Sequence, residues 1–244
     1  KIHHSVYLAI SRLQHVVRTM DATVDAIAHD IRTPLSRIQL SSEKALLSQL
    51  KSSEREGELE NALSDCAEYA IQASSMLKAL MKLNDELTNK QQIQNTQTDI
   101  TDVFKRVAHW YEDIAEEKKI SIECVTTSNT VFNLDADKLS QILVNLIDNA
   151  LKYTNIGGKI TLSSISKKNG EIEIKVTDNG IGIAKEYHKL IFQRLYRVDT
   201  SRSNTENYGL GLSLASAMVK NLGATLTVES AVGKGSCFTI KLNL

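Results

Sequence analysis

The apolar residues of the first ninety positions recur at alternating steps of four and three, and this heptad pattern predicts long helices that pack along a narrow seam. One stripe covers positions 2–38 and a second covers 59–80. Gly57 and Pro34 are the only glycine and the only proline before position 91. The polar segment 48–59 therefore predicts the turn of a helical hairpin.

A single hairpin leaves part of both apolar stripes exposed to water. Two hairpins that pair into a four-helix bundle bury the stripes, because each hairpin then covers the seam of the other. We therefore expect residues 1–90 to form a dimerising helical hairpin and the protein to be a homodimer.

The pattern changes after position 90. The polar segment 91–98 predicts a linker, and helical and strand periods are mixed beyond it. Asp135 stands where it can cap the helix that follows it. Strand pairs mixed with helices, without regular βαβ alternation, predict an α/β sandwich with helices on one face of a mostly antiparallel sheet. The expected helices cover 99–118, 135–152 and 210–221, and the expected strands cover 120–125, 130–134, 159–166, 171–178, 225–230 and 237–244.

The composition excludes several functional classes. The 29 basic residues balance the 29 acidic residues, so net charge gives no argument for nucleic acid and no such partner is predicted. The 3 cysteines are far apart and lack a C-x-x-C pair, which argues against a disulfide framework and a zinc site. No apolar run reaches the roughly 18–20 residues that span a bilayer, and no signal peptide opens the chain.

A histidine lies in the middle of the first stripe, in the segment AIAHDIRTPLSRIQL at 26–40. An isolated histidine of this kind is most simply an ordinary helical residue, with Pro34 as a kink. The chemical alternative is that His29 is a nucleophile, because neutral imidazole, with an unperturbed pKa of about 6.5, has a reactive lone pair near pH 7. Asp30 could then hold the proton of the other ring nitrogen and stabilise the imidazolium as it forms.

Two asparagines lie on one face of the helix expected at 135–152. Asn145 and Asn149 are four residues apart, and Lys152 and Tyr153 lie at the next turn. The amide oxygens could reach a magnesium ion that also holds phosphate oxygens, with Lys152 as a cationic partner. The alternative is a helix that exposes two asparagines without function, although asparagine is a poor helix former.

A glycine-rich turn follows the strand expected at 171–178, in the segment VTDNGIGI. The carboxylate of Asp178 could accept a hydrogen bond from the exocyclic amine of a base, while Gly180 and Gly182 allow the backbone to approach a ligand. Taken alone, D-x-G-x-G is also a common turn sequence.

A second glycine pair opens the helix expected at 210–221. Gly209 and Gly211 place free backbone N–H groups and the positive end of the helix dipole where phosphate can bind. The chain has no G-x-x-x-x-G-K-[ST] segment, which excludes a P-loop site. The thirty residues between the two glycine motifs have the size of a mobile lid over a nucleotide and include the basic residues Arg194, Arg197 and Arg202.

The order of these motifs decides between the alternatives. A heptad hairpin with H-D-x-R-T-P-L is followed by N-x-x-x-N, D-N-G-I-G-I and G-L-G-L-S-L-A. This combination resembles the catalytic core of the sensor histidine kinases of two-component signalling, and the resemblance covers essentially the whole chain. Residues 1–90 resemble the dimerisation and histidine-phosphotransfer domain, and 99–244 resemble the Bergerat-type ATP-binding domain.

The resemblance implies a role for each motif residue of the hairpin. His29 would accept the γ-phosphoryl group of ATP, and Asp30 would assist as general base. Thr33 matches the position that orients water when related kinases dephosphorylate their partner.

The resemblance also implies how the second domain holds ATP and Mg²⁺. Asn149, helped by Asn145, would hold the Mg²⁺ ion, and Asp178 would contact adenine. Lys152 and an arginine of the lid would contact phosphates, while Tyr153 would pack near the sugar or base. The full set of ATP-binding residues implied in this way is Asn145, Asn149, Lys152, Tyr153, Asp178, Gly180, Gly182, Ile183, Arg194, Arg197, Gly209, Leu210, Gly211 and Leu212.

Two residues depart from the pattern of the family. Leu195 replaces the usual phenylalanine of the lid, and Asn207 stands where a glycine often precedes G-L-G-L. Neither change removes a chemical group that the reaction uses.

Partners and location follow from the same resemblance. The family implies transfer of the phosphoryl group to an aspartate of a response regulator. It also implies that the chain is the cytoplasmic portion of a bacterial inner-membrane sensor, attached through a region absent from this chain. ATP and His29 belong to different domains, so the linker 91–98 is expected to act as a hinge. Whether transfer occurs within or between subunits stays open.

Two other functions compete with the kinase. An ATPase clamp of the chaperone or mismatch-repair kind shares D-x-G-x-G and the asparagine helix, but such relatives place a glutamate where Asn145 stands, and an amide cannot act as general base. A scaffold with a degenerate nucleotide site is the other alternative, and the presence of Asn149, Asp178, Gly180 and Gly209 argues against it.

Overall fold

The computed structural model describes residues 34–44, 52–87, 94–126, 130–167, 170–194, 196–198 and 209–243. The chain divides into two compact units. One contains Lys1–Leu80 and Ser203–Tyr208, and the other contains Met81–Arg202 and Gly209–Leu244.

Two helical segments of the first unit pack against each other as a hairpin. Residues 34–44 are helical, and helix α2 covers Ser52–Leu87, of which 81–87 belong to the second unit. The guanidinium of Arg37 lies 5.5 Å from the ring centroid of Tyr69, and the Ser42 hydroxyl lies 3.3 Å from the thiol of Cys66. The partner number falls as the residue number rises, so the two segments are antiparallel. The predicted hairpin is therefore confirmed within the described residues.

Part of the segment predicted as the turn of this hairpin is helical. Gly57 is inside α2, which begins at Ser52, so residues 52–59 of the predicted turn 48–59 belong to the helix, and 48–51 lie outside the described residues. The backbone φ of Gly57 is not positive, and a Cβ added there would meet nothing within 4 Å. A glycine in this position is a weak point of a helix rather than a turn residue.

We expect Gly57→Ala to raise the free energy of unfolding by about 0.5–1 kcal/mol, because alanine loses less backbone entropy than glycine in a helix. Denaturant unfolding followed by circular dichroism measures this change. Gly223→Ala is the matched control, since a Cβ there is equally free of contacts but φ is +70°; it is expected to destabilise. A loss of stability in Gly57→Ala would contradict the helical conformation of Gly57 and favour a turn at this position.

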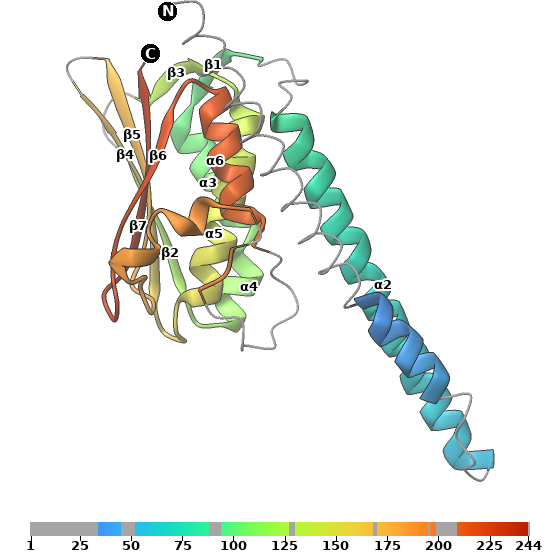
Figure 1. The fold of residues 1–244 in the computed structure, drawn as a ribbon. Helices are drawn as coiled ribbons and strands as arrows, with labels where there is room; N and C mark the ends of the chain where they lie inside the picture. The colour runs from blue at the N-terminus through green and yellow to red at the C-terminus, as the bar shows by residue number, and fades with distance from the viewer. Residues whose placement is uncertain are drawn as a thin grey trace, which may run out of the picture. The chain divides into compact units, whose positions relative to one another are not determined.

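The second unit is built on a five-stranded sheet. The strand order is β2-β4-β5-β7-β6; β2 and β4 are parallel, and the other three neighbouring pairs are antiparallel. Helices α3, α5 and α6 cover one face of this sheet (Figure 1). The predicted sandwich with a mostly antiparallel sheet is therefore confirmed. The strands are β2 Ser121–Thr126, β4 Lys159–Ser166, β5 Glu171–Asp178, β6 Thr225–Ala231 and β7 Gly235–Asn243, and the helices are α3 Ile100–Trp110, α4 Glu112–Glu117, α5 Ala136–Tyr153 and α6 Gly211–Asn221.

The core forms between this face and the helices because both are amphipathic at their own period. Alternate residues of β4 and β5 are buried, including Ile160, Leu162 and Ile174, and α5 contributes Ile142 and Leu146, all fully buried. The Asp135 side chain accepts from the backbone N–H of Lys138 at 2.9 Å and caps α5, as the sequence predicts. Capping and core packing together fix α5 beneath the sheet.

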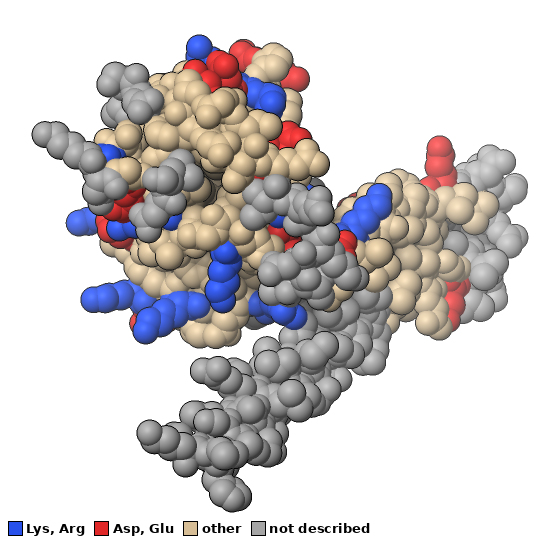
Figure 2. Space-filling model, turned by 90° about the horizontal axis from the view of Figure 1, so that it is seen from above, with Lys and Arg blue, Asp and Glu red and all other residues tan. Residues whose placement is uncertain are grey.

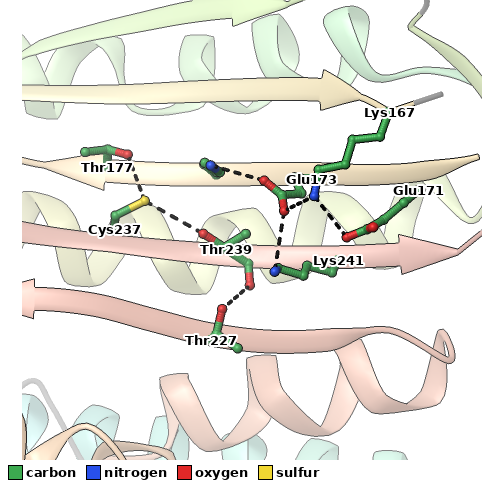
Figure 3. Close-up of polar contacts among 9 residues, drawn as sticks. Lys167, Glu171, Glu173, Thr177, Thr227, Cys237, Thr239 and Lys241 are labelled. Carbon is green, nitrogen blue, oxygen red and sulfur yellow. Dashed lines mark hydrogen bonds and ion pairs between the residues drawn. The ribbon is translucent and has the colours of Figure 1, made fainter. Parts of the chain in front are cut away.

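The other face of the sheet is polar. Glu173 of β5 lies among three lysines, with its carboxylate 2.6 Å from the Nζ of Lys167, 3.2 Å from that of Lys175 and 3.5 Å from that of Lys241 (Figure 3). Hydrogen bonds from Lys167 first and then Lys175, together with their charges, lower the pKa of Glu173 to about 2. A face of this kind is stable in contact with water.

Two segments differ from their predicted form. Thr96–Asp99 form strand β1, which pairs antiparallel with β3, Val131–Leu134, so part of the expected linker 91–98 belongs to a two-stranded sheet. The helix expected at 99–118 breaks at Tyr111. The hydroxyl of Tyr111 donates to Asp148 Oδ1 at 2.6 Å, which together with burial raises the pKa of Tyr111. This contact with α5 lies outside what a local period can predict.

The charged side chains of both signs are spread over the face seen from above in Figure 2. None of the helices in the described ranges combines the length and the hydropathy of a membrane-crossing segment.

Candidate functional site

Asp178 is the last residue of β5, and its side chain is held in a fixed position. It is 7% exposed, and its Oδ1 accepts from the backbone N–H of Gly180 at 2.9 Å and of Ser236 at 3.2 Å. Burial raises the pKa of Asp178, and the two backbone N–H groups oppose that shift. A buried, oriented carboxylate of this kind suits recognition of an amine by hydrogen bonding.

The glycines after Asp178 are required by close backbone packing. A Cβ at Gly180 would collide with the carbonyl oxygen of Tyr153, and a Cβ at Gly182 would collide with that of Ala231. Gly182 also has a φ of +69°, which disfavours any residue with a side chain. The D-x-G-x-G segment is therefore pressed against the end of α5 and against the β6–β7 turn.

The two asparagines of α5 present their oxygens rather than their amide nitrogens. Asn145 Nδ2 donates to the carbonyl of Gln141 at 2.8 Å, and Asn149 Nδ2 donates to the carbonyl of Asn145 at 2.7 Å. Each amide oxygen can therefore accept a hydrogen bond or coordinate a cation. Both side chains are half-buried.

The start of α6 faces these asparagines. A Cβ at Gly211 would lie 3.4 Å from Asn145 Oδ1 and 3.6 Å from Asn149 Nδ2. Gly209 has a φ of +64°, and Leu210, the N-cap residue, is buried and gives no side-chain cap. The first N–H groups of α6, including those of Gly211 and Leu212, therefore have no side-chain cap at this end of the helix.

The remaining predicted residues of this unit lie in α5, after β5 and in the lid. The Nζ of Lys152 lies 5.6 Å from the ring centroid of Tyr153, which is partly exposed. The backbone N–H of Ile183 donates to Ser230 Oγ at 2.7 Å. Of the lid arginines, Arg194 is exposed and Arg197 is half-buried.

The lid begins with two short 3-10 turns, η1 Lys185–Tyr187 and η2 Leu190–Phe192. The ring of Phe192 packs edge-on against that of Phe238 in β7, with centroids 6.4 Å apart. This contact ties the start of the lid to the sheet beside Asp178.

The predicted residues of the hairpin, His29, Asp30 and Thr33, lie outside the described residues, as do Leu195, Arg202 and Asn207. Their roles stay predictions.

Two partners of the site were not predicted as site residues. The backbone of Ser236 binds Asp178, and a Cβ at Gly235, whose φ is +84°, would collide with the carbonyl oxygen of Asp178. The strand register pairs Asp178 with Ser236. A signal was present in GKGSCFTIKL, but only the pairing of β5 with β7 shows what its glycine and serine do.

The last two turns of α5 thus bring three separate segments together. They carry the asparagine pair, pack against Gly180 and face Gly211. An acceptor for a base amine, amide oxygens for a cation and uncapped helical N–H groups for phosphate therefore lie on neighbouring elements. This set of an acceptor, cation ligands and N–H donors fits ATP with Mg²⁺.

Comparisons with known proteins agree with this arrangement. Residues 134–244 match the family described as histidine kinase-, DNA gyrase B-, and HSP90-like ATPase. The adaptive-response sensory kinase SasA of Crocosphaera subtropica is 29% identical over 238 residues, which cover 94% of this chain and 61% of the relative. The chain thus spans about three fifths of the length of that relative.

Two solved structures share the fold. The Acinetobacter baumannii histidine kinase AdeS matches with a TM-score of 0.69 and 25% identity over 88% of this chain and 97% of that one. The histidine kinase ThkA, solved in complex with the response regulator protein TrrA, matches with a TM-score of 0.66 and 18% identity over 94% of this chain and 63% of that one. Together with the order of motifs and the geometry around α5, these matches show that the chain resembles the catalytic core of the sensor histidine kinases.

Proposed function

We propose that the protein transfers the γ-phosphoryl group of ATP to His29 and then to an aspartate of a response regulator. The observation that carries this proposal is the meeting of Asp178, the two asparagines of α5 and the start of α6 around the last two turns of α5. The relatives named above support the same chemistry.

The residues of the site have distinct tasks in nucleotide binding. Asp178 accepts from the exocyclic amine of adenine, and the N-terminus of α6 binds phosphate through the N–H groups at Gly211 and Leu212. Asn149, with Asn145, would hold Mg²⁺, which offsets phosphate charge when bound. Lys152 and a lid arginine, Arg194 or Arg197, add positive charge beside the phosphates.

The chemical step uses the hairpin. A ring nitrogen of His29 forms a bond to the γ-phosphorus, the bond between that phosphorus and the bridging oxygen breaks, and ADP leaves with both electrons. Asp30 holds the proton of the other ring nitrogen and stabilises the imidazolium. Positioning and charge neutralisation supply most of the rate enhancement in phosphoryl transfers of this kind.

The test of this proposal is labelling of the 244-residue protein with [γ-³²P]ATP and Mg²⁺. Label that survives base but is lost in acid is expected, because a phosphohistidine P–N bond has this stability. A rapid ATPase without protein labelling would instead indicate a clamp of the chaperone kind.

We expect the protein to dimerise through α2. The side of α2 that packs within the chain includes Ala73, Met76 and Leu83, which are buried. Beside it, at heptad spacing, lies a stripe of exposed apolar side chains, Leu59, Leu63, Leu77 and Met81. A second copy of the hairpin covers such a stripe and completes a four-helix bundle.

Leu63→Glu is expected to weaken dimerisation about 100-fold or more, because the change occurs twice in a symmetric dimer and each buried leucine contributes about 1.5–3 kcal/mol. Sedimentation over a dilution series measures the dissociation constant. Ile71→Glu is the control, since Ile71 is as exposed (66% against 63%) but lies on another side of α2. A monomeric parent protein at micromolar concentration would refute the dimer.

Thr33→Ala is expected to keep autophosphorylation within about twofold of the parent and to slow dephosphorylation of the response regulator at least about tenfold, because the attacking water would lose the group that orients it. Release of phosphate from the phosphorylated regulator measures this activity. Equal phosphatase rates in variant and parent would remove Thr33 from the mechanism.

Attachment to a membrane through a region outside this chain stays a prediction from the family resemblance.

A further inference from the structure

The last turn of α2 carries a buried carboxylate that the proposed reaction does not use. The Glu86 side chain is fully buried, and its Oε2 lies 3.1 Å from the Nζ of Lys138, which is also buried. Asn221 Nδ2 donates to the Glu86 carbonyl at 2.6 Å and to Oε2 at 2.7 Å. We call Glu86, Lys138 and Asn221 the α2 clamp.

The clamp joins three elements of the C-terminal unit. Lys138 lies in the first turn of α5, and Asn221 is the last residue of α6. The same two helices carry, further along, Asn145 and Gly211 of the nucleotide site. The end of α2 therefore binds the first turn of α5 and the last residue of α6. In both helices, this is the end away from the expected phosphates.

The chain is fixed again a few residues later. The backbone N–H of Gln94 donates to Asp135 Oδ2 at 3.0 Å, while the other oxygen of Asp135 caps α5. Thr98 Oγ1 donates to the carbonyl of Leu134 at 3.0 Å, within the β1–β3 sheet. The residues on both sides of 88–93 are thus bound to the start of α5 or to the strand before it.

Opening the clamp would leave the buried Glu86 carboxylate without its hydrogen-bonded partners, with the longer-range charge of Lys82, one turn earlier in α2, left to offset it. Glu86 Oε1 is already buried without a hydrogen-bond partner among the described residues, so the carboxylate depends on Lys138 and Asn221. Removal of one partner from a buried ion pair is strongly unfavourable. We therefore do not expect these contacts to break and re-form in each catalytic cycle.

We propose that the clamp stays closed and that the pivot between the two units lies within α2, near the boundary of Leu80 and Met81, rather than in the linker 91–98. The reason for this position is that the boundary between the two compact units falls there. Residues 81–87 then move with the nucleotide site. Bending of α2 on the N-terminal side of these residues sets how ATP approaches the phosphoacceptor. This proposal rests on the proposed function, which requires the two units to approach each other.

Hydrogen–deuterium exchange of the 244-residue protein tests the clamp. The backbone N–H groups of 83–87 are expected to exchange at least tenfold more slowly than those of 77–81. Asn221→Ala is expected to speed exchange in 83–87 at least tenfold, and the exposed neighbour Lys220→Ala is expected to change nothing. Equal exchange in the two segments of the parent, or no effect of Asn221→Ala, would overturn the clamp.

Autophosphorylation tests the pivot. Ala79→Gly softens α2 beside the boundary and is expected to raise the single-turnover rate at least threefold with an unchanged ATP dissociation constant. Ala67→Gly carries the same helical cost further from the boundary and is expected to leave the rate unchanged. Equal rates in the two variants would overturn the pivot. Failure of the parent to take up label would refute the proposed function instead, and the exchange measurements would still decide the clamp.

Discussion

The variant His29→Gln is expected to take up no label from [γ-³²P]ATP, a loss of at least about a thousandfold relative to the parent, as for removal of a catalytic nucleophile. Glutamine matches the polarity of histidine, but its amide nitrogen has a delocalised lone pair and cannot attack phosphorus. The ATP dissociation constant is expected to stay within about twofold, because the predicted nucleotide contacts all lie beyond residue 144. Gel autoradiography and equilibrium binding measure the two quantities.

His109→Gln is the control for this variant. His109 is an exposed histidine of α3 that lies 2.9 Å from Glu112 and is not a predicted site residue. It is expected to label like the parent protein. Base-stable label in His29→Gln would place the phosphoacceptor elsewhere, and loss of label in both variants would indicate a general effect on folding.

Asp178→Asn is expected to weaken ATP binding by about 2–3 kcal/mol, or about 30- to 150-fold in the dissociation constant. The asparagine oxygen can still accept from the backbone of Gly180 and Ser236, so the loop is expected to keep its form. Its amide nitrogen, however, would face the adenine amine, and two donors cannot pair. Isothermal titration measures the affinity, and thermal unfolding checks that the fold is retained.

Glu173→Gln makes the same change on the same strand and serves as the control. Glu173 lies on the polar outer face of β5, in contact with lysines (Figure 3). ATP affinity in this variant is expected to stay within about twofold of the parent. Equal losses in the two variants would show that Asp178 acts through the stability of β5 rather than through the base.

Local sequence patterns predict the elements well where the conformation of a residue depends mainly on residues close to it in the sequence. The alternation around Ile160, Leu162 and Ile174 fixed both the strands and the face that they bury. Asp135 was identified as a cap from its position alone. The turn predicted at Gly57 is wrong. Glycine is typical of turns, but a long helix can include one at a cost of about 1 kcal/mol.

The candidate site was predicted as a set of residues, and the structure supplied their relation. Asp178, Asn145 and Gly211 each belong to a motif that can be found in the printed sequence. The partners that hold them could not be found there, because the hydrogen bond from Ser236 to Asp178 spans 58 positions and depends on the register of β5 with β7.

Spacing along the chain is enough to predict a helical first part, an α/β second part, the periods of the helices and strands, and the residue types available for phosphoryl chemistry. The packing of whole elements, by contrast, places the last turns of α5 at the centre of the site and brings Glu86 to Lys138 and Asn221, which are 52 and 135 positions away. Contacts over such separations leave no periodic trace, since they are set by how whole elements pack.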